Sequence, residues 1–163
     1  MATEIERKFR LSDPGWRAAV SRKSRLRQGY IANTPRASVR VRLADDRGWL
    51  SVKSMAAGMS RDEYEVAIPA SDADEMLERL CQGGHIEKWR HIVAYQGHEW
   101  EIDEFLGDNA GLVIAELELD SEDAGFARPP WLGPEVTHDE RYYNIRLAQR
   151  PFRDWPENQP EHR

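Results

Sequence analysis

Like-charged side chains recur in pairs two residues apart along this sequence. Neighbours at i and i+2 on a β-strand point to the same face about 6–7 Å apart, so the members of each pair repel one another. Paired carboxylates at that spacing favour hard divalent cations, which prefer oxygen ligands. Clustered arginine and lysine side chains favour polyanionic phosphates. The six pairs are Glu4/Glu6, Arg40/Arg42, Glu63/Glu65, Lys88/Arg90, Glu101/Asp103 and Glu116/Glu118.

A second interpretation of these pairs is an ordinary sheet, with a charged outer face that is solvated and held by cross-strand salt bridges. That interpretation explains any single pair well. In all six pairs, however, both members carry the same charge. We therefore favour an enclosed polar face, which lines the inside of a barrel. The apolar faces of the same strands would then be covered by helices and by a partner subunit.

The segments that carry the pairs are predicted as strands, because apolar and charged residues alternate along them. An amphipathic helix is predicted over residues 72–81, with shorter helices over 14–20 and 140–149. Many short strands with few helices indicate an antiparallel sheet or barrel. The predicted strands span residues 3–11, 25–32, 38–43, 49–53, 61–68, 86–95, 100–105 and 112–119.

Length and composition limit the classes of protein. The 163 residues predict one domain over 1–150, followed by a proline-rich polar segment over 151–163 that we expect to be a flexible tail. The formal net charge of -6 argues against a nucleic-acid partner. No apolar run approaches the ~20 residues of a membrane span, and the N-terminus lacks the apolar core of a signal peptide. The single cysteine, Cys81, fits a reducing compartment, so we expect a cytoplasmic protein with no membrane partner.

A series of short motifs follows the N-terminal segment Glu4-Ile5-Glu6-Arg7-Lys8, which has the pattern ExExK. In this order the motifs resemble the CYTH superfamily, the triphosphate tunnel metalloenzymes, over residues 3–148. The resemblance implies a mainly β (α+β) fold: a closed eight-stranded antiparallel β-barrel that forms a tunnel, with a few flanking helices. The further motifs are RQGYI at 27–31, VRVRL at 39–43, SVKS at 51–54, RDEYEV at 61–66, ELEL at 116–119 and EVTHDERYYN at 135–144.

The resemblance also implies roles for individual residues, carried over position by position. Its metal-binding carboxylates correspond to Glu4, Glu6, Asp103, Glu116 and Glu118. Its phosphate-binding side chains correspond to Lys8, Arg40, Arg42, Lys53, Lys88, Arg90 and, in the closing motif, Arg141. The catalytic set is Lys8, Arg40, Arg42, Lys53, Glu63 and Glu65, in which the two glutamates position the basic side chains or water.

On this resemblance we expect a metal-dependent triphosphatase that uses Mg²⁺ or Mn²⁺. Its partner would be a small-molecule triphosphate, most simply inorganic tripolyphosphate cleaved to pyrophosphate and phosphate, and a homodimer is the assembly we consider. Three alternatives stay open: a class IV adenylyl cyclase on the same scaffold, a thiamine triphosphatase, and a non-catalytic module that binds polyphosphate or nucleotide. The paired carboxylates count against the last, because binding an anion alone is better served by cations without acids.

Overall fold

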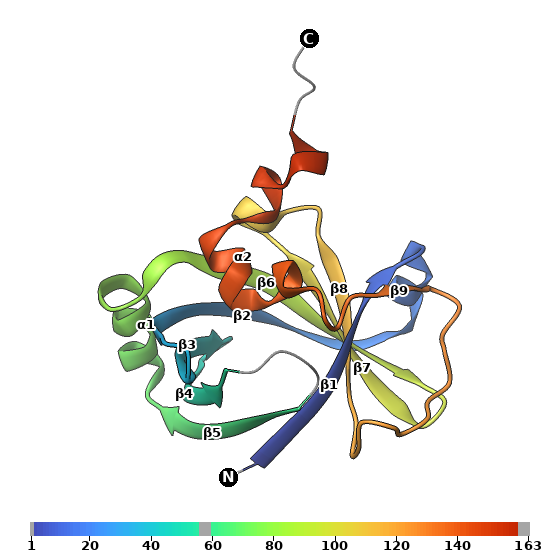
Figure 1. Ribbon diagram of the computed structural model, residues 1–163, viewed down its shortest axis with the longest axis horizontal. Coiled ribbons are helices and arrows are strands. Elements are labelled where there is room, and N and C mark those ends of the chain that lie inside the picture. The colour runs from blue at the N-terminus through green and yellow to red at the C-terminus, as the bar shows by residue number, and fades with distance from the viewer. Residues whose placement is uncertain (1, 56–59, 160–163) are drawn as a thin grey trace.

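The strands form where apolar and charged residues alternate, so that each strand has one apolar and one polar face. The computed structural model describes residues 2–55 and 60–159, and the side chains of Ala2 and Glu4 lie outside that description. Figure 1 shows the strands curving around a common interior. The strands in the described residues are β1 (Ala2–Leu11), β2 (Val20–Asn33), β3 (Ala37–Ala44), β4 (Arg47–Ser54), β5 (Ser60–Ile68), β6 (Gln82–Tyr95), β7 (His98–Phe105), β8 (Val113–Glu118) and β9 (Leu132–Glu135).

Strand β1 closes the barrel because it pairs with two different strands along its length. Its residues 2–5 pair with β5, and its residues 6–10 pair with β8. Around the ring the neighbours follow the order β1, β5, β4, β3, β2, β6, β7, β8, and then β1 again, while β9 joins β1 outside the ring. All these pairings are antiparallel, so the described residues confirm the closed eight-stranded antiparallel barrel.

The register of β1 and β8 shows which side chains share the inner face. Glu6 lies opposite Glu118, and Lys8 lies opposite Glu116. Directly opposed residues point to the same side of a sheet, so these four charges gather on one face. Phe9, the next residue along β1, points the other way into a fully buried apolar cluster. The alternation in the sequence therefore separates a charged interior from an apolar exterior.

An apolar cluster covers the outer face of β1, β7 and β8. It contains Phe9, Trp100 and Trp131, which are at most 5% exposed. The Trp100 ring meets Phe9 and Trp131 edge-on, with ring centroids 5.7 and 5.5 Å apart. Such edge-to-face contacts are a preferred geometry of aromatic pairs. The segment that follows β8 carries Trp131 back over these strands, so this outer face is covered by the chain itself.

Helix α1 (Ala70–Arg79) covers the outer face of β3 and β4. Its Ala73 and Leu77 pack against Val41 of β3. The helix begins and ends two residues earlier than the range 72–81 predicted from the sequence. Leu80, which the apolar periodicity placed on the buried stripe, is therefore 52% exposed. Among the described residues no helix is both long and apolar enough to cross a membrane.

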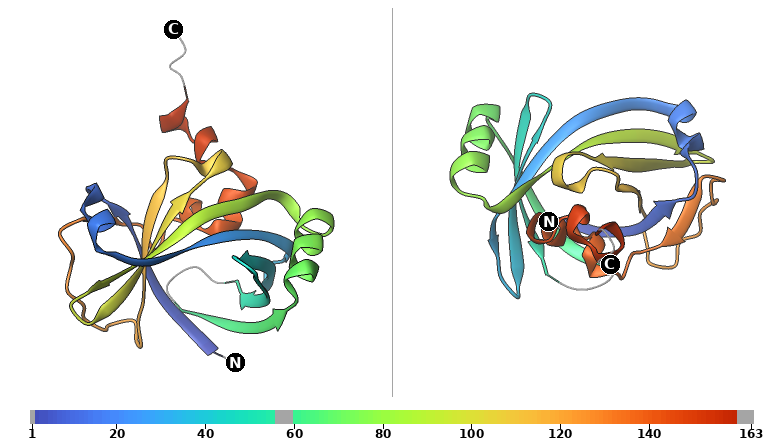
Figure 2. Two further views of the ribbon diagram at one scale, coloured as in Figure 1. Left: turned by 180° about the vertical axis from the view of Figure 1, so that it is seen from behind. Right: turned by 90° about the horizontal axis from the view of Figure 1, so that it is seen from above.

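The C-terminal segment packs against the barrel, where α2 (Asn144–Gln149) contacts β2 and β6 (Figure 2). Its Leu147 joins Ile86 and Phe105 in one buried cluster. Trp155, between the turns η4 (Phe152–Asp154) and η5 (Pro156–Asn158), belongs to the same cluster and is 2% exposed. Residues 151–159, which the sequence analysis assigned to a flexible tail, therefore include an indole that is buried in this cluster. The rest of that tail lies outside the described residues.

Candidate functional site

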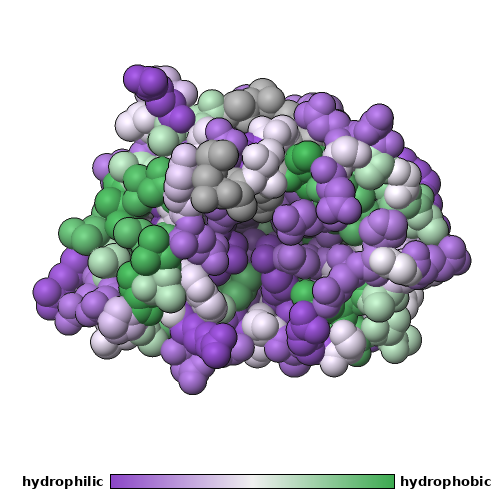
Figure 3. Space-filling model, turned by 90° about the horizontal axis from the view of Figure 1, so that it is seen from below, coloured by the Kyte–Doolittle hydropathy of each residue, from purple (hydrophilic) through white to green (hydrophobic). Residues whose placement is uncertain are grey.

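A polar cavity of about 210 Å³ lies within the barrel, and charged residues supply nearly all of its lining. We call it the tunnel cavity. Figure 3, which views the molecule from below, shows a hollow surrounded by hydrophilic side chains. The enclosed charged face expected from the sorted pairs is therefore present. The predicted site residues that line the cavity are Glu6, Arg40, Arg42, Lys53, Glu63, Glu65, Arg90, Glu116 and Glu118.

Strands β3 and β4 bring three cations, Arg40, Arg42 and Lys53, to one wall of the tunnel cavity. Glu63 of β5 lies 3.8 Å from Arg40 Nη2 and 3.9 Å from Lys53 Nζ, which keeps both side chains at this wall. Burial, with added repulsion from Arg40 and Arg90, lowers the pKa of Arg42 to about 9. A bound polyanion would relieve that repulsion, because opposite charge favours the protonated guanidinium. This wall is suited to phosphate oxygens.

Strands β1, β7 and β8 bring carboxylates to the opposite wall. Glu6 lies directly opposite Glu118, and Glu101 lies directly opposite Glu116. Like charges in direct cross-strand opposition destabilise a sheet. Burial raises the pKa of Glu101, and the nearby Glu116 raises it further, although Arg90 acts in the other direction. This wall therefore has a surplus of negative charge that a cation would offset.

Lys8 lies just behind the acidic wall, where its side chain is 6% exposed. Its Nζ is 3.5 Å from Glu116 Oε1 and 3.8 Å from Glu6 Oε1. Burial alone would lower the pKa of Lys8, but Glu116 and Glu6 together outweigh burial and raise it. The ammonium therefore stays charged at neutral pH and links the two carboxylates.

The carboxylate of Asp103 is fully buried and bonded to two cations. Its Oδ1 accepts a hydrogen bond from Arg90 Nε at 2.8 Å, and its Oδ2 accepts from Arg90 Nη2 at 2.9 Å and from Lys88 Nζ at 2.7 Å. Burial would raise the pKa of Asp103, but Arg90 and Lys88 hold it far below its ordinary value. Burial lowers the pKa of Lys88 to about 8; Asp103 acts in the other direction, and the nearby charge of Arg90 adds to the lowering.

Asp103 and Lys88, like Lys8, therefore lie behind the cavity lining rather than on it. Asp103, predicted as a metal ligand, has both oxygens bonded to cations. Lys88, predicted to bind phosphate, has a side chain that is 0% exposed. Asn144 of α2 does line the cavity, and its Oδ1 accepts a hydrogen bond from Lys88 Nζ at 3.3 Å. In this structure Lys88 therefore meets Asn144 where the sequence analysis expected it to meet substrate.

Arg141, predicted to reach over the tunnel mouth, lies on the outer surface instead. Its guanidinium is 3.1 Å from Asp139 and 3.2 Å from Glu157, and it stacks 4.6 Å from the centre of the Trp155 ring. Its side chain is 50% exposed and does not line the tunnel cavity. Two carboxylates and an indole thus hold Arg141 at the C-terminal turns, and its role in binding phosphate stays a prediction.

The barrel and its facing walls of opposite charge agree with a family-model comparison. The sequence matches the model of the CYTH domain over residues 2–150. The chain belongs to the CYTH domain family. The motifs that first pointed to this family lie within the matched range, and their charged residues supply both walls of the tunnel cavity.

Two curated CYTH relatives are similar to this chain over nearly their whole length. An inorganic triphosphatase of Acetivibrio thermocellus is 46% identical over 157 residues, which are 96% of this chain and all of the relative. An inorganic triphosphatase of Nitrosomonas europaea is 40% identical over 153 residues, covering 90% of this chain and 97% of the relative. The crystal structure of the inorganic triphosphatase NE1496 matches with a TM-score of 0.62 and 36% identity, covering 89% of this chain and 97% of that one.

Two residues that line this CYTH cavity were not among the site residues inferred from the sequence. Glu101 and Asn144 line the cavity, and the fully buried Gln28 accepts a hydrogen bond from Arg42 Nε at 3.4 Å. The alternation on β7 already pairs Glu101 with Asp103, so the sequence pattern was enough to predict Glu101 as a site residue. Asn144 carried no such signal, because its approach to Lys88 depends on how α2 packs against β6.

The carboxylates of this CYTH chain fit a divalent metal by their chemistry. Glu6, Glu101, Glu116 and Glu118 supply hard oxygen donors on one wall, in two directly opposed pairs. Within the residues described, no three acidic, histidine or cysteine side chains already converge on one point that could hold an ion. Mg²⁺ commonly binds through one or two carboxylates together with water and substrate phosphates, so it does not require such a preformed cage. The predicted ligand Glu4 lies outside the described side chains.

Proposed function

We propose that this chain hydrolyses inorganic tripolyphosphate to pyrophosphate and phosphate with a divalent metal ion. The observation that carries the proposal is one enclosed cavity with cations on β3 and β4 facing carboxylates on β1, β7 and β8. A linear polyanion matches the cationic wall, and a cation shared between that polyanion and the carboxylates matches the acidic wall. The two curated relatives are inorganic triphosphatases, which supports the same reaction.

The cationic side chains bind and orient the substrate in this proposal. Arg40, Arg42 and Lys53 donate hydrogen bonds to phosphate oxygens from one wall, and Arg90 donates from the β6 side. Phosphoryl transfer depends mainly on positioning and on stabilising charge that shifts to the leaving oxygen. Because these cations already line the cavity, little reorganisation is needed when that charge develops.

The acidic side chains divide into two roles. Glu6, Glu116 and Glu118 hold the metal, with Glu101 as a further donor on the same wall. A bound Mg²⁺ or Mn²⁺ would supply charge neutralisation and a water of lowered pKa. Glu63 and Glu65 position the basic wall, since Glu63 contacts two of its cations and Glu65 Oε2 accepts a hydrogen bond from Ser51.

Asp103 and Lys88 act as positioning residues in this reaction. The two bonds from Arg90 to Asp103 fix the plane of the guanidinium, and its remaining Nη1 lies 2.5 Å from Glu101 at the cavity. Lys88 anchors the other side of Asp103 and donates to Asn144. Asp103 and Lys88 together therefore keep Arg90 oriented where the two walls meet.

An inorganic substrate is favoured over the adenylyl cyclase and thiamine triphosphatase alternatives. Among the described residues, the lining of the tunnel cavity contains charged side chains and one amide but no aromatic ring. A nucleobase or thiamine ring normally stacks on aromatic or apolar side chains. The tunnel cavity alone offers no such surface, so its recognition is directed at the phosphate chain.

The experiment that tests this function is a substrate panel with distinct product assays. Tripolyphosphate, ATP, thiamine triphosphate and pyrophosphate are each incubated with Mg²⁺, with Mn²⁺ or with excess chelator, and phosphate, pyrophosphate and cyclic AMP are measured. We expect the highest kcat/KM for tripolyphosphate, equal yields of phosphate and pyrophosphate, and no turnover in chelator. Cyclic AMP from ATP, or full activity in chelator, would overturn the proposal.

We also propose a cytoplasmic location, which is supported by the free thiol of Cys81 as the sole cysteine. The homodimer considered from the sequence stays a prediction, which light scattering on the purified chain would decide.

A further inference from the structure

Apolar side chains are exposed on the outer face of β5 and at the end of α1. Among the described residues, all the large hydrophobic side chains that are exposed lie on this one side of the barrel. Tyr64 and Val66 of β5 are 53% and 61% exposed, and Leu80, directly after α1, is 52% exposed. Figure 3 shows hydrophobic atoms gathered at the left of the molecule, the side that carries α1, β4 and β5 in Figure 1.

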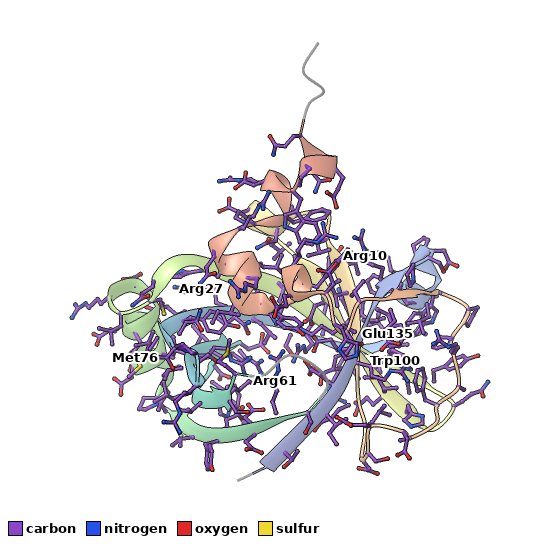
Figure 4. The ribbon with its side chains drawn as sticks, viewed as in Figure 1. Arg10, Arg27, Arg61, Met76, Trp100 and Glu135 are labelled. Carbon is purple, nitrogen blue, oxygen red and sulfur yellow. The ribbon has the colours of Figure 1, made fainter. Side chains whose placement is uncertain are left out.

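These side chains belong to one continuous surface. Val66 lies directly opposite Leu50 of β4, and Tyr64 lies directly opposite Val52. Leu50 also packs against the cluster beneath α1, as Met76 does. In Figure 4, Met76 lies at the lower edge of α1, toward β5. We call this surface the outer patch, and its residues are Leu50, Val52, Tyr64, Val66, Met76 and Leu80.

The outer patch resembles the core of a protein interface. A contiguous apolar surface in water is unfavourable, so monomers rarely retain a large one. Tyrosine and methionine are enriched at interface cores, and charged residues are depleted there. The charged side chains of the same two strands, Lys53, Glu63 and Glu65, point the other way and line the tunnel cavity. The outer patch therefore needs a partner that presents an apolar surface.

Two charges of opposite sign flank Met76 on α1. Asp72 precedes Met76 by four residues and Arg79 follows it by three, so the three side chains lie along one side of the helix. Asp72 and Arg79 are exposed, and neither forms an ion pair within the part of the chain that the structure describes. On the opposite flank of α1, by contrast, Asp74 pairs with Arg27 of β2 at 3.0 Å.

A second copy of this chain supplies what both charges lack. In a twofold dimer every contact occurs twice, because the same surface of each copy meets the other. Two antiparallel α1 helices, related by an axis near Met76, bring Asp72 of each copy to the partner's Arg79. The two charges lie about 10 Å apart along the helix in both copies, so one register forms both pairs. The same arrangement sets one outer patch against the other.

We propose that the outer patch is the core of a homodimer interface, in which two antiparallel α1 helices pair and Asp72 bonds to the partner's Arg79. A stable interface buries about 800 Å² of each partner, so the outer patch forms its centre and the exposed polar residues around it form the rim. The tunnel cavity lies on the other side of β4 and β5, and the proposal does not rest on the proposed hydrolysis.

The test is sedimentation velocity of the purified chain from about 1 to about 100 µM, where a moderately stable homodimer dissociates on dilution. We expect wild type to form a dimer. Val66→Glu should weaken dimerisation at least about a hundredfold, because it places an unpaired charge at the centre of the interface. The matched control is Ala18→Glu, at an exposed residue of η1 (Pro14–Ala19) on the opposite side of the barrel, and it should match wild type (Figure 1). Far-UV circular dichroism checks that each variant is folded.

Charge reversals on α1 test the identity of the partner and the direction of the helices. Asp72→Lys alone and Arg79→Glu alone should each weaken self-association at least about tenfold, because each sets like charges against one another twice. An equimolar mixture of the two variants should dimerise about as tightly as wild type, since both contacts then join opposite charges. Only a second copy with antiparallel helices predicts this recovery.

Three results would overturn the proposal. The first is a wild-type chain that stays monomeric throughout the series, which would leave a different protein as the candidate that covers the outer patch. The second is a dimer that Val66→Glu leaves unchanged, because the interface then lies elsewhere. The third is a mixture of the two charge variants that associates no better than either variant alone. None of these results bears on tripolyphosphate hydrolysis, which the substrate panel measures separately.

Discussion

Asp103 accepts two hydrogen bonds from the guanidinium of Arg90, from Nε at 2.8 Å and from Nη2 at 2.9 Å. The carboxylate is fully buried, so bulk solvent does not reach either bond. The paired contact leaves Nη1 of Arg90 directed at Glu101 on the cavity lining. Stability and site geometry therefore depend on the same buried charge.

Asp103→Asn should destabilise the protein by about 3–5 kcal/mol. The amide keeps the shape of the side chain but leaves Lys88 and Arg90 buried without their anion, and breaking one partner of a buried pair has a cost of that size. Urea unfolding at pH 7 measures the change. The matched control is Asp108→Asn, whose carboxylate is 55% exposed and paired with Arg153; surface pairs are worth about 0–1 kcal/mol. Equal effects of the two variants would show that the buried network is not formed.

The free energy of unfolding should rise with pH between about 8 and about 10.4 through Lys88. Burial lowers the pKa of Lys88 to about 8 in the folded protein, whereas an unfolded lysine titrates near about 10.4. In that window the unfolded chain binds more protons, so raising the pH favours the folded state. The pKa of Arg42 is also lowered, so Arg42 contributes a rise of the same sign. The free energy of unfolding is therefore measured across a pH series for wild type and for Lys88→Met, and the difference between them gives the contribution of Lys88. Parallel curves for the two proteins would contradict the lowered pKa.

Glu118→Gln should raise the metal concentration needed for half-maximal turnover at least about tenfold, with little loss of fold. The substitution keeps the side chain's size but removes one of the carboxylates that share the acidic wall, and smaller changes around metal sites already weaken binding by about 10–100-fold. Turnover of tripolyphosphate against Mg²⁺ concentration measures it. Glu122→Gln, at an exposed residue away from the cavity, is the control and should match wild type. An unchanged metal requirement in Glu118→Gln would remove this residue from the metal site.

Tripolyphosphate without metal should raise the melting temperature more than sulfate does at equal ionic strength. The folded chain gathers Arg40, Arg42, Lys53 and Arg90 around one cavity, and the unfolded chain scatters them. Binding at a hundredfold excess over Kd adds about 2.7 kcal/mol, or roughly 5–11 °C for a domain of this size. Thermal unfolding in chelator with each salt measures the difference. Equal shifts would indicate general screening of exposed charges.

The sequence by itself indicated the strands and placed each charged pair on one face, and its resemblance to the CYTH family implied the closed barrel. Side chains on a strand alternate strictly, so the spacing of Arg40 from Arg42, or of Glu116 from Glu118, already places both members of each pair on one face. An apolar opposite face then requires cover, which α1 and the segment around Trp131 provide. The two-residue alternation along a strand therefore indicates which way each side chain points, even when the neighbouring strands are not known.

Only the tertiary structure decided what each inward charge meets. Asp103 and Glu101 belong to one alternating pair, yet Asp103 lies deeper and is bonded to Lys88 and Arg90, while Glu101 lines the cavity. Depth within a barrel depends on strand stagger and register, which are long-range properties and leave no local pattern. The burial of Trp155 depends in the same way on distant contacts, because a proline-rich segment is ordered only where it finds apolar partners such as Tyr142. Alternation sets the direction of a side chain, and the closed barrel sets its neighbours.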